Sequence, residues 1–145
     1  MLVINKLSGL LDEQLKICKK LLELENQKTE ILLKGDFKAL DDIVTRQQPY
    51  IMSSANCEKR REKLLDEMGA SGLTLRQIIE SNPQAKQLES VFSQLNDVAA
   101  QLKKACEKNK AILDSKLKVI NYILSTTGAS DDGMITYSNI RQGQD

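Results

Sequence analysis

The sequence of 145 residues contains no histidine and no tryptophan, and its only aromatic residues are two Phe and three Tyr. The absence of histidine excludes Ser-His-Asp triads, histidine-ligated zinc and histidine general bases. The 21 Lys and Arg residues nearly balance the 20 Asp and Glu residues, so the basic excess typical of nucleic-acid-binding proteins is missing. Phosphate-loop, dinucleotide-binding and HExxH motifs are also missing. We therefore expect neither an enzyme nor a cofactor.

Long apolar runs are missing as well. The uncharged run near the start covers only residues 7–11, and we expect neither a signal peptide nor a membrane-spanning segment. The three cysteines, Cys18, Cys57 and Cys106, form no CxxC pair and are odd in number, which favours a reducing, cytoplasmic environment. Each lies on an apolar helical stripe, so we expect all three to pack as small apolar side chains rather than to bind metal.

The sequence contains only two Pro and seven Gly, which favours long helices. Apolar residues recur every three or four positions over 2–34 and again over 37–68, which predicts two amphipathic helices. Gly35 is expected to end the first in a left-handed conformation, and Asp36 to cap the second. Because the apolar phase continues across Pro49, we expect the second helix to be kinked but continuous.

A short helix is predicted over 74–80, after Gly69 and Gly72 break the pattern. The last helix is predicted over 84–125, with Pro83 in its first turn. Its heptad seam consists of Leu88, Phe92, Leu95, Ala99, Leu102, Cys106, Asn109 and Leu113. Periodicity ends at residue 126. The predicted fold is all-α, an elongated antiparallel bundle of three long helices plus one short helix, with a helical domain over 1–127 and a flexible tail over 128–145.

Polar residues interrupt the predicted apolar faces at one level. Glu25 lies near the centre of the first helix's apolar face, and folding at Gly35 brings it beside Arg46 and Gln47. In-register pairing of the last helix brings Asn109 to the same level. A structural polar layer of these four residues would fix the register at some cost in stability, so Asn109→Leu is expected to raise stability or change the oligomeric state.

The predicted last helix is longer than its neighbours. It spans about 63 Å, against about 50 Å for the first two, so about nine residues should overhang the turn at Gly35. These residues are apolar on more than one side, which is typical of a protein-interaction surface. They comprise Leu117, Val119, Ile120, Tyr122, Ile123 and Leu124. Alternatively, the connection over 69–83 shifts the last helix back and covers them.

Several short segments occur in an order and at spacings that resemble the FlgN family of flagellar type III export chaperones. They are residues 21–25 (LLELE), 33–40 (LKGDFKAL), Arg60-Arg61, 73–75 (LTL), 109–113 (NKAIL), Thr136-Tyr137 and Gly143-Gln144. The resemblance covers nearly the whole chain. It implies a helical, cytoplasmic chaperone that binds hook–filament junction proteins, prevents their early assembly and brings them to the export gate.

The resemblance also implies two functional regions. Client binding falls in the C-terminal part of the last helix, where the candidate residues are Asn109, Leu113, Leu117, Ile120, Tyr122, Ile123 and Leu124. Tyr137 in the tail is the candidate for docking on a component of the flagellar export gate. The competing hypothesis is a structural protein without a client, in which the heptad seam from Leu88 to Leu113 forms a homodimeric coiled coil.

Overall fold

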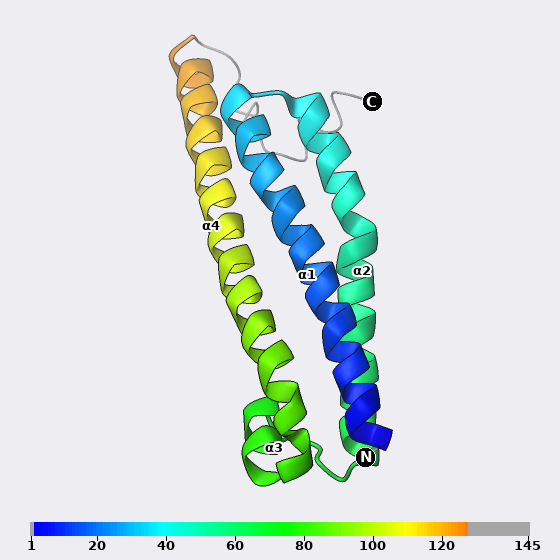
Figure 1. The fold of residues 1–145 in the computed structure, drawn as a ribbon. Helices are drawn as coiled ribbons and strands as arrows, with labels where there is room; N and C mark the ends of the chain where they lie inside the picture. The colour runs from blue at the N-terminus through cyan, green and yellow to red at the C-terminus, as the bar shows by residue number, and fades with distance from the viewer. Residues whose placement is uncertain (1, 128–145) are drawn as a thin grey trace.

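In the computed structural model, residues 2–127 are described, and they contain helices but no strands. The helices are α1 (Leu2–Lys34), α2 (Phe37–Glu67), α3 (Leu75–Ser81), the 3-10 helix η1 (Pro83–Leu88) and α4 (Glu89–Thr126). The three long helices lie along one another, with α2 antiparallel to α1 and α4, while α3 and η1 pack at one end (Figure 1). This confirms the predicted all-α bundle of three long helices and one short one. The predicted tail lies outside the described residues.

Local capping chemistry sets the ends of the helices. Gly35 has a φ of 71°, as the predicted turn requires, and the Asp36 carboxylate accepts a hydrogen bond of 3.0 Å from the Ala39 amide. Thr74 and Gln77 form a reciprocal capping box at the start of α3. α2 continues through Pro49 without interruption, as predicted.

The start of the last helix differs from the prediction. Residues 83–88 form a 3-10 helix, and the α-helix begins only at Glu89. The Asn82 side chain accepts from the Gln84 amide, and the Asn82 carbonyl accepts from the Ala85 amide. A 3-10 helix has three residues per turn, so Ala85 and Leu88 project to the same side. Both are fully buried, which explains why the tighter helix is favoured here.

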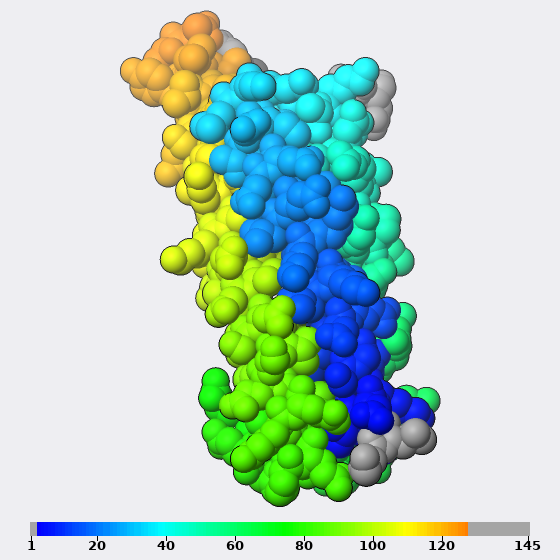
Figure 2. Space-filling view, viewed as in Figure 1, coloured from blue at the N-terminus to red at the C-terminus, as the bar shows by residue number. Residues whose placement is uncertain are grey.

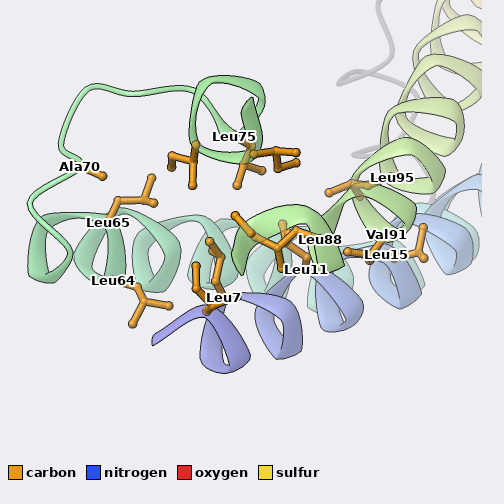
Figure 3. Close-up of a cluster of buried hydrophobic side chains, with 14 of the residues drawn as sticks. Leu7, Leu11, Leu15, Leu64, Leu65, Ala70, Leu75, Leu88, Val91 and Leu95 are labelled. Carbon is orange, nitrogen blue, oxygen red and sulfur yellow. The ribbon is translucent and has the colours of Figure 1, made fainter. Parts of the chain in front are cut away.

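The largest hydrophobic cluster fills the end of the bundle near α3, where Leu7, Leu11 and Leu88 have no exposed surface (Figure 3). A second cluster lies near the Gly35 turn and is built around Leu24 and Leu40. The core therefore extends along the whole bundle rather than forming one central mass.

The predicted heptad seam of α4 is wrong at alternate positions. Of the predicted seam, Leu88, Leu95 and Asn109 are buried. Phe92 is only half-buried, and Ala99 and Cys106 are exposed. Val91 and Val98, each one residue before a predicted seam position, are buried instead. The residue pairs 91/92, 98/99 and 105/106 are all apolar. The apolar pattern therefore fits a seam through either member of each pair, and it cannot decide which member faces the bundle. The three cysteines were expected to pack as small apolar side chains. Cys18 and Cys57 are buried as expected, but Cys106 is exposed.

α1 is the central helix of the bundle. It packs closely against both α2 and α4, whereas α2 and α4 make no comparably close backbone contact within residues 2–127 (Figure 1). In that same range, no helix is long and apolar enough to cross a bilayer. No group of three metal-ligating side chains was found among the described residues either.

Candidate functional site

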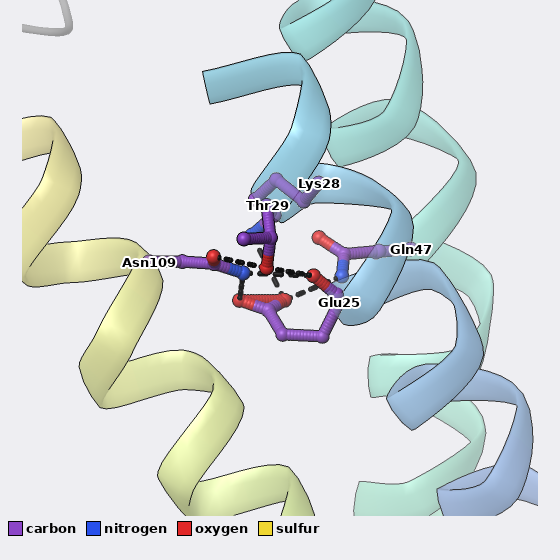
Figure 4. A network of polar contacts seen from close by, with 5 residues as sticks. All are labelled: Glu25, Lys28, Thr29, Gln47 and Asn109. Carbon is purple, nitrogen blue, oxygen red and sulfur yellow. Dashed lines mark hydrogen bonds and ion pairs between the residues drawn. The ribbon is translucent and has the colours of Figure 1, made fainter. Parts of the chain in front are cut away.

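A buried polar cluster connects the three long helices near the middle of the bundle. Asn109 of α4 donates from Nδ2 to the Glu25 carbonyl at 2.8 Å and to Glu25 Oε1 at 3.2 Å. Gln47 of α2 donates from Nε2 to Glu25 Oε2 at 2.8 Å. These three side chains have only 3–5% of their surface exposed. The structure therefore brings together three of the four residues predicted for the polar layer (Figure 4).

The fourth predicted residue, Arg46, is exposed and does not join the cluster. Arg46 precedes Gln47 by one residue, so the two side chains point about 100° apart around α2. The positive charge comes instead from Lys28, whose Nζ lies 3.0 Å from Glu25 Oε2. Thr29 donates its hydroxyl to Asn109 Oδ1 at 2.6 Å. Sequence reasoning missed Lys28 and Thr29, although their spacing of three and four residues from Glu25 indicates helical neighbours.

These contacts determine the charge of Glu25. Burial raises the pKa of its carboxyl group, but hydrogen bonds from Gln47, Lys28 and Asn109 outweigh burial and lower the pKa below its ordinary value. Glu25 is therefore ionised at neutral pH. Its interactions stabilise the folded state above the pKa of the unfolded carboxyl group, and this contribution is lost as the pH falls through the lower folded-state pKa.

The hydrogen bonds of Asn109 reverse the expected sign of Asn109→Leu. The substitution leaves the buried Glu25 carboxylate with one donor fewer, so we expect a loss of about 1–3 kcal/mol in unfolding free energy rather than a gain. Replacing Glu25, Gln47 and Asn109 all by Leu removes the buried charge and is expected to restore or exceed the original stability. Urea unfolding measures both variants, and Asn96→Leu at an exposed position of α4 is the control. An Asn109→Leu variant as stable as the unchanged protein would contradict the prediction.

α4 extends beyond the turn between α1 and α2. Hydrogen bonds tie α1 to η1 and α4 at three levels. Asn5 contacts Gln87 of η1, Glu25 contacts Asn109 of α4 and Leu33 contacts Lys116 of α4, with sequence separations of 82, 84 and 83. The nearly constant separation shows that the two helices stay in register. Adding about 83 to the last residue of α1 gives 117, so residues 118–126 of α4 overhang by about 14 Å (Figure 2).

Lys116 fixes the base of this overhang. Its Nζ donates to the Leu33 carbonyl at 3.0 Å, and this carbonyl is one of the last four of α1, which have no partner within the helix. A cation at this position also interacts favourably with the helix dipole. A hollow of about 360 Å³ lies beside this contact, between the Gly35 turn and α4, with Phe37, Val119 and Ile120 in its walls.

The overhang exposes apolar side chains on one side of α4. Val119, Tyr122 and Ile123 have 57%, 69% and 51% of their surface exposed. The opposite side continues the stripe that faces the bundle, and its residues Leu117, Ile120 and Leu124 are half-buried, as is Leu113. Of the candidate client-binding residues, only Asn109 is fully enclosed, because it belongs to the polar cluster. The last candidate, Tyr137, lies outside the described residues.

A family sequence model described as FlgN protein matches residues 1–142. The chain belongs to the FlgN family. It is also similar to a Bacillus subtilis (strain 168) protein named uncharacterized protein YvyG, with 33% identity over 117 residues, covering 75% of this chain and 73% of that protein. No solved structure matches the chain. FlgN is a chaperone family rather than a known enzyme family, and membership supports a role as a flagellar export chaperone.

Three of the segments that carry the FlgN resemblance, 21–25, 33–40 and 109–113, lie near the base of the overhang, whereas Arg61 and Leu73 lie at the opposite end of the bundle. Glu25 ends the segment 21–25, and Asn109 begins the segment 109–113, so the two segments join at the polar cluster. The segment 33–40 forms the turn over which α4 overhangs. In this FlgN-family chain, these three segments therefore include residues that hold the overhang in position.

Proposed function

We propose that this FlgN-family chain is a cytoplasmic chaperone for hook–filament junction proteins, which binds their terminal amphipathic helices, prevents premature assembly and delivers them to the flagellar type III export gate. The observation that carries the proposal is the overhang of α4, where Val119, Tyr122 and Ile123 expose more than half of their surface. Large apolar side chains gathered on one exposed helix end are typical of a protein-interaction surface.

The shape of this surface suits a helical client. An amphipathic helix recognises a groove through apolar anchors spaced three or four residues apart. In the proposed complex, such a helix lies along the overhang and inserts an anchor into the hollow beside Phe37 and Ile120. Leu113, Leu117 and Leu124 extend the apolar contact along α4.

Sedimentation of the purified chain, alone and with a junction protein, tests the proposal against the alternative of a structural homodimer. We expect a one-to-one complex with the client, since the overhang offers one continuous surface. A tight dimer that binds no junction protein would favour the coiled-coil alternative. A dimer seam would have to bury Ala99 and Cys106, and both are exposed in the single chain. Their exposure therefore does not decide between the two hypotheses.

The proposal assigns a separate role to Tyr137. In the sequence it is the one aromatic residue beyond the predicted helices, in a polar segment, and the family resemblance makes it the candidate for export-gate docking. We expect Tyr137→Ala to leave client affinity within about two-fold, because α4 is unchanged, while export of the client falls strongly. Calorimetry and secretion assays measure the two effects, with Ser138→Ala as the control. Equal loss of binding and export would contradict a separate role.

A further inference from the structure

A second hollow lies at the opposite end of the bundle, far from the overhang. It has a volume of about 540 Å³ and lies between the end of α2, the start of α3 and the start of α4. Leu65, Leu73 and Phe92 provide apolar walls, and 44% of the Leu73 surface is exposed. Arg61 and Arg76 also line the hollow, and the described part of the chain contributes no acidic residue to this lining.

The two arginines are available to bind an anion. The Arg76 guanidinium lies over the Phe92 ring, 5.6 Å from its centroid, and it makes no ion pair within residues 2–127. The contacts of Arg61 with Gln14 and Glu58 are both 3.5 Å long, at the outer limit of a hydrogen bond, and the contact with Glu58 is an ion pair along α2. The aromatic ring thus holds one guanidinium in place without neutralising it, and the other has only weak partners.

Arg60, the residue before Arg61, has closer contacts with an acidic side chain than Arg61 has. It forms two hydrogen bonds to the Glu13 carboxylate, at 2.9 and 3.3 Å, and this carboxylate raises the pKa of Arg60. Arg60 is therefore already paired with an acid. Arg61, the next residue, has only longer contacts of 3.5 Å with Gln14 and Glu58.

We propose that this hollow binds a short segment of a partner protein in which an acidic residue lies next to a large apolar residue. The planar guanidinium groups match the geometry of a carboxylate. The apolar walls accept the neighbouring side chain, and together they select against segments that offer only one of the two features. The site is separate from the proposed client surface, because at least about 30 Å of α4 lies between Phe92 and Leu113.

The acidic pair in the C-terminal segment of the same chain is not the occupant. That segment contains adjacent acids at Asp131 and Asp132, followed by apolar residues. These acids come within five residues of Thr127, a reach of at most about 18 Å. Phe92 lies 35 residues back along α4, at about 53 Å from Thr127. The acidic pair therefore cannot reach the hollow of its own chain.

Selection from a random peptide library displayed on phage tests the proposal with the full chain as bait. The library is first depleted on a variant carrying Arg61→Gln and Arg76→Gln, and then selected on the unchanged protein. We expect enrichment of peptides with Asp or Glu beside Leu, Ile, Met or Phe. Enriched peptides without acids, or no enrichment over the depleted library, would overturn the proposal.

Binding measurements with the enriched peptide locate the site. We expect the affinity to fall at least ten-fold for Arg76→Gln and for Arg61→Gln, and to stay within two-fold for Arg60→Gln, whose charge Glu13 already neutralises. Phe92→Leu, which keeps an apolar side chain but removes the ring beneath Arg76, is expected to weaken binding less than Arg76→Gln. Equal losses for Arg60→Gln and Arg76→Gln would overturn the proposal, as would full competition by millimolar inorganic phosphate, or a dimer of the chain that requires Arg76.

Discussion

Replacing Leu117 and Ile120 by Asp is expected to abolish binding of a junction-protein helix while leaving the bundle folded. Both side chains lie at the base of the overhang, and Ile120 lines the hollow beside Phe37. A buried apolar anchor commonly contributes about 2 kcal/mol or more to binding, so loss of two anchors should lower the affinity at least about 1,000-fold. Calorimetry with a synthetic client helix measures this change, and circular dichroism measures the helical content.

A matched control separates the position of the new charges from their number. Gln94 and Gln101 are exposed on α4, away from the overhang, and replacing both by Asp adds the same charge to the same helix. We expect this control to bind the client within about two-fold of the unchanged protein, because charges far from an interface have small effects at physiological salt. Unchanged affinity in the Leu117 and Ile120 variant would mean that the overhang is not the client site.

A second pair of substitutions decides which side of the overhang contacts the client. Tyr122 and Ile123 have 69% and 51% of their surface exposed and do not line the hollow, whereas Leu117 and Ile120 are half-buried. Replacing Tyr122 and Ile123 by Asp disturbs the exposed side without adding charge to the hollow or to the stripe that faces the bundle. If the client helix lies in the hollow, the Leu117 and Ile120 pair should have the larger effect. A client that covers the outer side would reverse this order.

The sequence predicted the helices because their ends depend on local chemistry. Gly35, Asp36 and Thr74 act on backbone groups within a few residues, so their roles follow from residue type and position. The 3-10 helix over 83–88 was missed, because a tight first turn became favourable only through burial of Ala85 and Leu88 against other helices.

The polar cluster shows where sequence reasoning stops. Counting residues on both sides of the Gly35 turn places Gln47 at the level of Glu25, whereas the level of Asn109 also requires the last helix to pair in register. The exposure of Arg46 depends on the rotation of α2 about its own axis, which adjacent polar residues at 46 and 47 leave undetermined. The same ambiguity affected the heptad seam, where neighbouring apolar residues such as Val98 and Ala99 permit two rotations of α4.

The length of the overhang depends on contacts distant in sequence. Three contacts set the level of η1 and α4 against α1. They join Asn5 to Gln87 of η1, Glu25 to Asn109 of α4 and Leu33 to Lys116 of α4. Composition and periodicity predict that α4 is longer than α1, but only its starting level decides how far it extends beyond the turn. Leu88 immediately precedes α4 and is packed in the hydrophobic core, so it is a candidate for setting this starting level.

Leu88→Ala is expected to cause a large loss of stability, about 2–5 kcal/mol out of the roughly 5–15 kcal/mol that is usual for a domain. Leu88 has no exposed surface and ends η1, where it packs in the cluster shared by α1, α2 and α3. Urea unfolding measures the loss, and Leu33→Ala, at a residue with 60% of its surface exposed, is the control and should change stability by less than about 0.5 kcal/mol.

The effect of Leu88→Ala on client binding tests how the register is held. The contacts of Asn109 with Glu25 and of Lys116 with the Leu33 carbonyl lie far from Leu88, so we expect both to form in the variant. We therefore expect the folded fraction to bind a client helix with unchanged affinity, because the overhang keeps its length. If affinity falls together with stability, the core at Leu88 rather than the polar cluster sets the level of α4. If stability changes by less than about 1 kcal/mol, the packing of η1 against α1 contributes little to the fold.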